Sequence, residues 1–580
     1  MKKTSIDFET IIIGGGGAGL TAAIHLAKEN HKVAIISKVP PIFSHTSAAQ
    51  GGINANFGNK EPDDWKWHMY DTVKGSDWLG DQDAIEIMCK NANDAVLFLQ
   101  KIGVNFDLDS DGTIRQKKYG GQTLHYGSDQ LAHRACSVTD RTGKVIMHSL
   151  LEEALKHNVK FINYNFVIDL MIEDQICYGL TSYDIPSGII QTFKTTNVII
   201  ATGGYSQIYK ETTSSNTCTG DGIALIANKS IGLKDMEFVQ FHPTSLYNTG
   251  ILISETTRSL GGILLNKNSE PFMKNYAPKY KELASRDIVS RAMTSELLKL
   301  NGYGEHSDHL MLDLRHIDSD ALENQLTNVH HVCKTFLHIN PKNDLIPVTP
   351  ASHYTMGGIP TNKKCEVVKI THTHQTKIIG LYAIGEAACV SVHGANRLGC
   401  NSLLDIIVFG IEVSKHILSK NYEGYSNIFK YNFKNPLEET NGNLSALSLI
   451  DGIKIISQKY LGMNRSAEDL KKGYSQLKKI GNLINQVSIN LETKKWNNKV
   501  ISFLELKNLH TCAMHTAFAA ISRKESRGSH YRKDFSERND KLYWKHTITT
   551  INENNEEVIF SKIRGDTKDV GFFQLESRNY

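Results

Sequence analysis

A glycine-rich turn between an apolar segment and a run of small residues is the feature that most constrains how this chain can fold. The turn begins at Gly14, follows residues 8–13, which predict a buried parallel strand, and precedes a helical pattern at residues 20–28. Gly14 permits a tight turn, Gly16 lets the backbone approach a pyrophosphate, and Gly19 lets the helix pack on the strand. The order of strand, glycine turn and helix therefore predicts a dinucleotide-binding α/β fold with a doubly wound parallel sheet.

The next apolar segments indicate which dinucleotide is bound. Residues 32–36 run into Ser37 and Lys38, where an NAD site usually carries an acidic residue for the ribose. A later apolar segment, residues 378–384, runs into a glycine turn that carries Glu386, which could accept hydrogen bonds from a ribityl chain. These features favour a flavin nucleotide over NAD.

A histidine follows the first glycine turn closely. It lies in Ser44-His45-Thr46, and Ala49-Gln50-Gly51-Gly52 comes directly after it. A histidine at this distance from a dinucleotide site could hold a flavin covalently.

Alternating strand and helix patterns divide the chain into several domains. The dinucleotide-binding domain is expected in two parts, residues 1–236 and 353–430, interrupted by an α+β capping domain at residues 237–352. Apolar residues at helical spacing predict a helical domain at residues 431–540, and residues 541–580 form a C-terminal region.

Composition excludes several function classes. The net charge is only +4, from 65 basic and 61 acidic residues, and no basic block alternates with aromatic residues, so we expect no nucleic-acid partner. The nine cysteines form no pair or cluster at metal-ligand spacing, so we expect no metal site and no iron–sulfur cluster. We also expect no membrane span, because no apolar run approaches ~18 to 20 residues. The first strand begins by about residue 8, which leaves no room for a signal or transit peptide.

Polar residues that suit a dianionic substrate gather near the boundaries of the expected capping domain. Arginine forks and histidine donors bind carboxylates through charge-assisted hydrogen bonds, and ligand sites form in clefts between domains. Each residue taken alone is more often structural, but their chemistry converges. The candidates are His242, Ser254, Glu255, Arg258, Arg286, His353 and Arg397.

Long ordered blocks of the sequence closely resemble the flavoprotein subunits of the succinate dehydrogenase and fumarate reductase family. These blocks are residues 44–52, 67–77, 140–143, 240–244 and 393–399. The likeness is dense from residue 7 to about 415, thins through the expected helical domain, and returns near residue 525.

The resemblance implies a fold and a function. The fold would be an FAD-binding domain of glutathione-reductase type with an inserted capping domain, a helical domain and a C-terminal tail. The chain would oxidise succinate to fumarate by hydride transfer to FAD. It would pass electrons to an iron–sulfur subunit and then to quinone. Membrane anchor subunits would hold the complex at the cytoplasmic face of a bacterial inner membrane.

The resemblance also implies a role for each site residue. His45 would carry FAD covalently, and Arg286 would exchange a proton with the substrate, with Glu255 and Arg258 as the relay behind it. The substrate carboxylates would meet His242, Ser254, His353 and Arg397. The other FAD contacts would be Gly14, Gly15, Gly16, Gly17, Ala18, Gly19, Ser37, Lys38, Ser44, Thr46, Ala49, Gln50, Gly51, Gly52, Asp221, Glu386, Ser402 and Leu403.

Three alternatives stay open at the level of sequence. A fumarate reductase would commonly carry Glu at the position of Gln50, and an L-aspartate oxidase would lack a histidine at the position of His45. An electron-transfer or assembly protein could keep the fold without turnover. Two departures from the family pattern bear on the flavin. Phe43 stands where Arg is usual, and Cys400 stands where Gly or Ala is usual.

Overall fold

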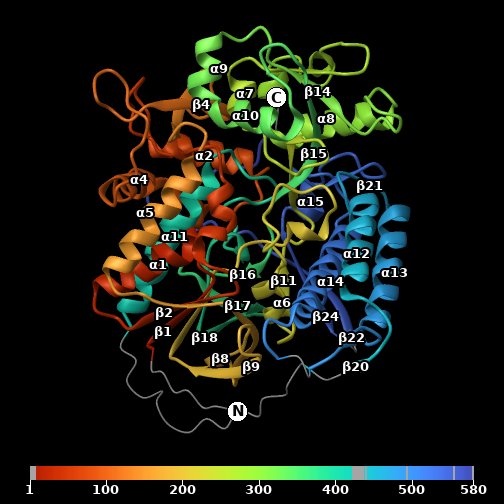
Figure 1. Ribbon diagram of the computed structural model, residues 1–580. Helices are drawn as coiled ribbons and strands as arrows, with labels where there is room; N and C mark the ends of the chain where they lie inside the picture. The colour runs from red at the N-terminus through yellow and green to blue at the C-terminus, as the bar shows by residue number, and fades with distance from the viewer. Residues whose placement is uncertain (1–7, 421–436, 438–439, 492–493, 553–554, 578–580) are drawn as a thin grey trace.

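The computed structural model describes residues 8–420, 437, 440–491, 494–552 and 555–577 (Figure 1). A large sheet with flanking helices lies opposite a smaller sheet with short helices, which is green in Figure 1, and long helices pack along one side. The domain boundary expected between residues 430 and 431 lies outside the described residues.

The large sheet is built on five parallel strands in the order β6-β2-β1-β10-β18. Alternate side chains of β1 enter two different cores: Ile11 and Ile13 belong to one cluster, and Ile12 belongs to the other. Strands buried on both faces need continuous apolar runs, and this explains why three isoleucines, residues 11–13, follow one another without alternation. The bounds are β1 Thr10–Ile13, β2 Val33–Ser37, β6 Lys160–Asn163, β10 Asn197–Ile200 and β18 Gln375–Ala383.

Beyond β18 the sheet continues through β8 (Ile176–Asp184), which pairs parallel with β18. The antiparallel additions are β7 (Asn165–Glu173) and β9 (Ile189–Lys194), which both pair with β8, and β17 (Glu366–Ile370), which pairs with β18. The sheet is therefore mixed, whereas the glycine turn alone predicts a parallel one. A short connection between successive strands produces an antiparallel pair, because a parallel pair needs a long crossover.

Three helices cover one face of the sheet and lie together in Figure 1: α1 (Gly17–Lys28), α5 (Thr142–Lys156) and α11 (Asn401–Leu418). A Cβ added at Gly410 would lie 2.8 Å from Thr21, so the small residue lets α11 approach α1 closely. A smaller antiparallel sheet lies beyond these helices, with β3 (Ile53–Asn54), β5 (Leu131–Cys136) and β4 (Gln116–Thr123). Its neighbours are α2 (Trp65–Gly75), α3 (Gln82–Lys90) and α4 (Ala92–Lys101).

The segment from β12 to β15, called the cap below, forms a second folding unit with its own apolar cluster. Its antiparallel sheet has the order β12-β15-β14-β13. The strands are β12 (Val239–Leu246), β13 (Ile263–Leu265), β14 (Leu310–Asp313) and β15 (Ile346–Thr355). Its helices are α7 (Thr256–Ser259), α8 (Arg286–Leu298), α9 (Ser319–Gln325) and α10 (Thr327–Val332).

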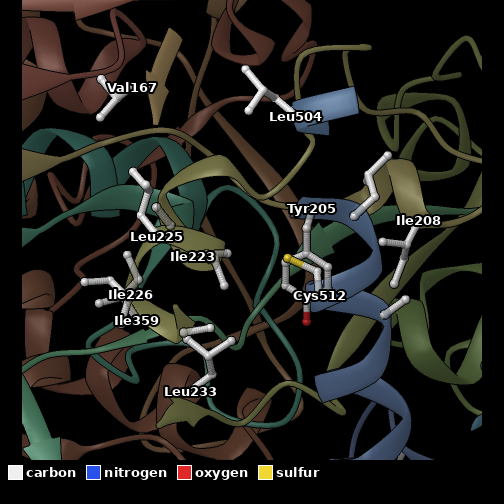
Figure 2. Packing of buried hydrophobic residues seen from close by; sticks show 14 of the residues in the cluster. Val167, Tyr205, Ile208, Ile223, Leu225, Ile226, Leu233, Ile359, Leu504 and Cys512 are labelled. Atoms are coloured by element: carbon white, nitrogen blue, oxygen red, sulfur yellow. The ribbon is translucent and has the colours of Figure 1, made fainter. Parts of the chain in front are cut away.

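Three long helices pack on one another: α12 (Ala446–Tyr460), α13 (Ala467–Ile484) and α14 (Asn498–Ser522), and α14 also packs on α6 (Asp221–Ala227). The helical spacing at residues 470–484 is confirmed, because Leu470, Leu477 and Ile480 are buried in the same cluster. Figure 2 shows Cys512 of α14 against Tyr205, beside α6. The long helices thus pack directly on the α/β part.

The C-terminal region, which periodicity leaves unplaced, completes a separate sheet. Strand β24 (His546–Asn552) pairs with β11 (Leu233–Lys234) on one side and with β25 (Asn555–Ser561) on the other. Residues 562–577 then run across α3, where the backbone N–H groups of Lys568 and Asp569 donate to Glu86. The end of the chain therefore lies on the first part of the α/β domain.

A buried cluster of charged residues anchors β24. His546 Nδ1 lies 2.6 Å from Asp235 Oδ2, and its Nε2 lies 3.1 Å from Asp81 Oδ1. Lys234 and Arg564 also pair with Asp81. Burial alone would lower the pKa of His546, but the two carboxylates outweigh burial and Lys234, and the pKa is raised.

Candidate functional site

A cavity of about 1170 Å³ runs between the α/β part and the cap. It begins at the glycine turn after β1 and reaches the residues that join β12, α7, α8 and β15. Almost all of the candidate residues line it, although they are drawn from positions 14 to 403 of the chain. The exceptions are Gly19 and Arg258.

The glycine turn forms one end of the cavity. Gly14 has φ +110°, and a Cβ there would lie 2.2 Å from the carbonyl oxygen of Ala201, so only glycine fits. A Cβ at Gly16 would meet nothing closer than 3.6 Å, which leaves its backbone open to a ligand. Gly19 does not line the cavity: a Cβ there would lie 2.1 Å from Gly14 O, which agrees with its expected packing role.

The helix α1 begins at this turn, and its first residues, Gly17 and Ala18, line the cavity. The Gly17 N–H donates to Thr46 Oγ1 at 3.2 Å, so the segment that carries His45 is tied to the helix N-terminus. A helix N-terminus attracts negative charge through its free N–H groups and its dipole. The turn therefore has the chemistry that a pyrophosphate needs.

His45 lies in a short 3₁₀ helix (His45–Ala48) and lines the cavity. Its Nδ1 accepts a hydrogen bond from the Ser215 backbone N–H at 3.2 Å. Burial, helped by the charge of Arg397, lowers the pKa of His45 to about 4, so the imidazole is neutral near pH 7. Phe43, two residues earlier, is exposed and places no charge beside it.

Lys38 and Asp221 form an ion pair of 2.9 Å in the cavity wall. Helix α14 supports both residues: Glu505 accepts from Lys38 at 2.8 Å, and Asn508 Nδ2 donates to Asp221 at 2.9 Å. Lys38 follows the end of β2, where an acidic residue would mark an NAD site. A cation at this position therefore favours a ligand other than NAD.

Glu386 also lines the cavity, in a 3₁₀ turn after β18. Its Oε1 accepts from both the backbone N–H and the hydroxyl of Thr355. Burial raises the pKa of Glu386 to about 7 despite these donors. Thr355 therefore already orients the carboxyl group that is expected to face the ligand.

Two arginines lie at the far end of the cavity, on opposite sides of the boundary between the cap and the α/β part. Arg286, the first residue of α8, donates from Nε and Nη2 to Glu255 Oε2 at 2.8 and 2.6 Å. Its Nη1 donates to Gln240 Oε1 at 3.1 Å. Arg397 lies over the ring of Tyr354 at 4.5 Å. Tyr354 belongs to β15, so residues of the cap contact both guanidinium groups.

Glu255 connects Arg286 to a second buried arginine. Arg258 Nη2 lies 3.6 Å from Glu255 Oε1, and Arg258 Nη1 donates to Glu282 O at 2.5 Å. Burial would raise the pKa of Glu255, but Arg286 and Arg258 outweigh it and hold the pKa below its usual value. Burial lowers the pKa of Arg258. Arg258 lies behind Glu255 and does not line the cavity, as expected of a relay.

Two histidines lie beside these arginines. The rings of His242 and His353 are 5.1 Å apart. His242 Nδ1 accepts from the Thr244 N–H, and His353 Nδ1 shares a hydrogen bond of 2.8 Å with the Thr213 hydroxyl. Burial holds the pKa of each ring well below its usual value. For His242, the nearby arginines lower the pKa further. Both imidazoles are therefore neutral.

The remaining candidates complete the wall. Ser402 Oγ accepts from Arg397 Nη1 at 2.6 Å, and Leu403 lies beside it at the start of α11. Cys400, just before α11, has φ +66° and is buried, and its Sγ accepts from the Gly52 N–H at 3.4 Å. The other lining candidates are Gly15, Ala18, Ser37, Ser44, Ala49, Gly51 and Ser254.

Gln50 and Asp140 are among the residues that connect the α/β part to the cap. Gln50 Nε2 donates to Leu252 O of the cap at 2.8 Å. Asp140 Oδ2 accepts from the backbone N–H groups of Asn328 and Val329, in the first turn of α10. Sequence reasoning treats Asp140 only as part of a family block, whereas the fold makes it a helix cap across a domain boundary.

Sequence reasoning also missed Gln240, Tyr119 and Thr213 as parts of the site. Gln240 Nε2 donates to Arg397 O and Asn396 Oδ1, so its amide joins Arg286 to the loop of Arg397. It lies two residues before His242, and this proximity was a usable signal. Tyr119 and Thr213 meet the site only through long-range contacts, for which the sequence offers no signal.

Within the described ranges, no group of three or more His, Cys, Asp and Glu side chains is placed to hold a metal ion. All nine cysteines are buried and free. Among the residues of known placement, no helix is both long and apolar enough to cross a membrane.

Comparison with known proteins gives a consistent assignment. Residues 9–403 match the FAD binding domain family, and residues 452–580 match the fumarate reductase flavoprotein C-terminal family. The succinate dehydrogenase flavoprotein subunit of Rickettsia felis is 45% identical over 95% of this chain and 94% of its own length. The fumarate reductase flavoprotein subunit of Haemophilus influenzae is 32% identical over 95% and 93%. A solved E. coli quinol fumarate reductase superposes with a TM-score of 0.90, at 29% identity, over 100% of this chain and 99% of that one.

Proposed function

The chain belongs to the family of succinate dehydrogenase and fumarate reductase flavoprotein subunits, and we propose that its cavity oxidises succinate to fumarate. The observation that carries the proposal is the gathering of Arg286, Arg397, His242 and His353 at one end of a cavity that begins at a dinucleotide turn. The higher identity to the succinate dehydrogenase relative, 45% against 32%, favours this direction over fumarate reduction.

The cavity residues fit FAD. Gly16 and Gly203 leave open backbone, since a Cβ at Gly203 would meet no atom within 4 Å. Gln50 Oε1 and Arg397 Nε are buried without a hydrogen-bond partner in the described part of the chain, as expected where a polar ligand supplies one. When bound, FAD supplies the two-electron acceptor for a hydride from the substrate.

We place the covalent attachment of FAD at His45 Nε2. The Ser215 N–H already occupies the lone pair of Nδ1. Once Nε2 is substituted, the neutral ring still presents that Nδ1 lone pair, so this hydrogen bond suits the linked state. Because Nδ1 accepts, the hydrogen of the neutral ring is on Nε2, and attachment requires Nε2 to lose it. The low pKa of His45 means that this is the only proton that has to leave.

Arg397, His242, His353 and Ser254 bind the two substrate carboxylates. The guanidinium of Arg397 is held by Tyr354 and Ser402, so its fork meets a carboxylate with little loss of side-chain freedom. The two neutral imidazoles have their Nδ1 atoms engaged, which leaves each Nε2 as the atom that can face a carboxylate. Fixed placement of this kind contributes much of the rate, because a preset geometry can be worth ~7 to 11 kcal/mol.

Arg286 gives one of its own protons to Glu255 as it takes the proton that leaves the substrate carbon, so Arg286 keeps its charge and Glu255 becomes protonated. Glu255 accepts from Arg286 at two atoms and lies 3.6 Å from Arg258, so the three side chains form one row leading away from the cavity. The row is buried, which excludes bulk water from the reacting end.

A carrier of two electrons has to pass them on, and the relatives are named as subunits. We therefore propose an iron–sulfur subunit as the direct partner and membrane anchor subunits beyond it. The complex would lie at the cytoplasmic face of a bacterial inner membrane. In this arrangement, the flavinylated chain alone reduces a dye with succinate, and reduction of quinone requires the added partner subunits.

The test combines flavin attachment with turnover. Acid-precipitated protein should keep its flavin, the peptide with His45 should gain the mass of FAD, and the protein should reduce a dye when succinate is added. In His45→Ser, FAD should bind through the glycine turn without a covalent bond, and fumarate reduction should survive better than succinate oxidation. Flavin released entirely from denatured wild-type protein would refute the attachment. Absence of succinate-dependent dye reduction would refute the function.

A further inference from the structure

Three buried hydroxyl groups form a chain at the substrate end of the cavity. The Tyr119 hydroxyl lies 2.9 Å from Thr256 Oγ1, and Thr256 Oγ1 lies 3.1 Å from Ser254 Oγ. The exposed fractions of the three residues are 2%, 2% and 1%. Tyr119 belongs to β4 in the α/β part, whereas Thr256 begins α7 in the cap. The chain of hydroxyls therefore crosses the boundary between the two units.

The hydrogen positions in this chain depend on what Ser254 binds. Ser254 Oγ donates to Thr256 Oγ1 in the structure and accepts from the Thr256 backbone N–H at 3.3 Å. A substrate carboxylate only accepts hydrogen bonds, so Ser254 must turn its hydrogen away from Thr256 to bind one. The Thr256 hydroxyl would then have to donate to Ser254, and it would need a new donor for its own lone pair.

Tyr119 is the group that can supply that donor. Burial raises the pKa of Tyr119, so its hydroxyl keeps its hydrogen at every pH at which the enzyme works. After the reversal, Tyr119 donates to Thr256, Thr256 donates to Ser254, and Ser254 donates to the carboxylate. Each hydroxyl rotates and keeps its own hydrogen, so no proton is transferred. Aligned hydrogen bonds of this kind strengthen one another in a buried site.

We propose that Tyr119 and Thr256 are positioning residues that orient the Ser254 hydroxyl hydrogen toward a substrate carboxylate. The proposal rests on the proposed function, in which Ser254 binds the dicarboxylate. Tyr119 then acts across the domain boundary. It belongs to the α/β part and orients Ser254 of the cap, and Ser254 binds the substrate.

The first test is Tyr119→Phe, which removes one hydroxyl and keeps the ring. KM for succinate should rise about threefold to tenfold, which is the range expected for one net hydrogen bond, while kcat stays within about twofold. The Kd for malonate, a dicarboxylate that cannot be oxidised to an alkene, should rise by the same factor when followed by flavin absorbance. Thr256→Val should have a similar effect, and Thr256→Ser, which keeps the hydroxyl, should restore wild-type affinity.

The decisive comparison uses a background without the Ser254 hydroxyl. If Tyr119 acts through Ser254, then Tyr119→Phe should leave the malonate Kd of Ser254→Ala unchanged. An equal loss in both backgrounds, or wild-type affinity in Tyr119→Phe, would overturn the proposal. Flavin content and melting temperature identify a variant that fails to fold, in which case Thr256→Val takes its place in the same cycle. Wild-type protein that does not bind malonate would overturn the proposed function itself, and with it this proposal.

Discussion

Glu255→Gln is the change that most directly tests the row of Arg286, Glu255 and Arg258. Glu255 accepts two hydrogen bonds from Arg286, at 2.8 and 2.6 Å, and lies 3.6 Å from Arg258. Gln has nearly the same shape, so the change removes a charge and a proton acceptor with little change in volume. Two buried arginines then lose the carboxylate between them.

The magnitude follows from the two hydrogen bonds. A hydrogen bond to a charged group contributes about 1.5 to 3 kcal/mol, and a neutral one contributes about 0.5 to 1.5 kcal/mol. Neutralising the acceptor therefore costs about 1 to 1.5 kcal/mol per bond, or about 2 to 3 kcal/mol for both. Each ~1.4 kcal/mol corresponds to a factor of ten in rate, so kcat should fall by about 30-fold to 150-fold from misplacement of Arg286 alone. Loss of the relay adds to this fall.

The assay is kcat and KM in both directions, with succinate and an oxidised dye and with fumarate and a reduced dye. Flavin content should match wild-type protein, and KM should change little, because Glu255 is not assigned to a carboxylate of the substrate. A kcat within threefold of wild type, with normal flavin content, would show that Glu255 neither orients Arg286 nor carries its proton.

Two further outcomes follow from other contacts. Arg397→Lys should raise KM for succinate by about tenfold or more, because lysine lacks the fork and the stacking on Tyr354, and an unchanged KM would contradict the assignment. In the buried cluster, the raised pKa of His546 means that the folded state binds its proton more tightly than the unfolded chain. Wild-type protein should therefore have a larger free energy of unfolding than His546→Gln. This difference should be greatest below about pH 6.5 and should shrink as pH rises through the pKa of His546 in the folded state. Urea midpoints measured across this pH range check the sign, and an advantage that grows with pH would refute it.

Local patterns predicted the elements that a short stretch of chain specifies. The strand expected at residues 8–13 is found at Thr10–Ile13, and the helix expected at residues 20–28 is found at Gly17–Lys28, because both depend on neighbours within a few residues. The antiparallel extension of the sheet was not predicted, because an apolar strand reads the same in a parallel and an antiparallel pair.

The residue types of the site were also readable from the sequence, because carboxylate binding and dinucleotide binding each need particular side chains at particular turns. Only the tertiary structure decided which of them meet. Arg286 and Gln240 come together because α8 packs on β12, and Tyr119 reaches Thr256 across a domain boundary.

The placement of the C-terminal region shows the same division. Its charged and aromatic residues have no periodicity that indicates a partner, yet His546 lies between Asp81 and Asp235, hundreds of residues earlier in the chain. Sequence determines local conformation through propensities and apolar spacing, whereas a buried charge is stable only beside its partner. Which partner that is depends on how the whole chain is folded, and this is why the tertiary structure alone decided it.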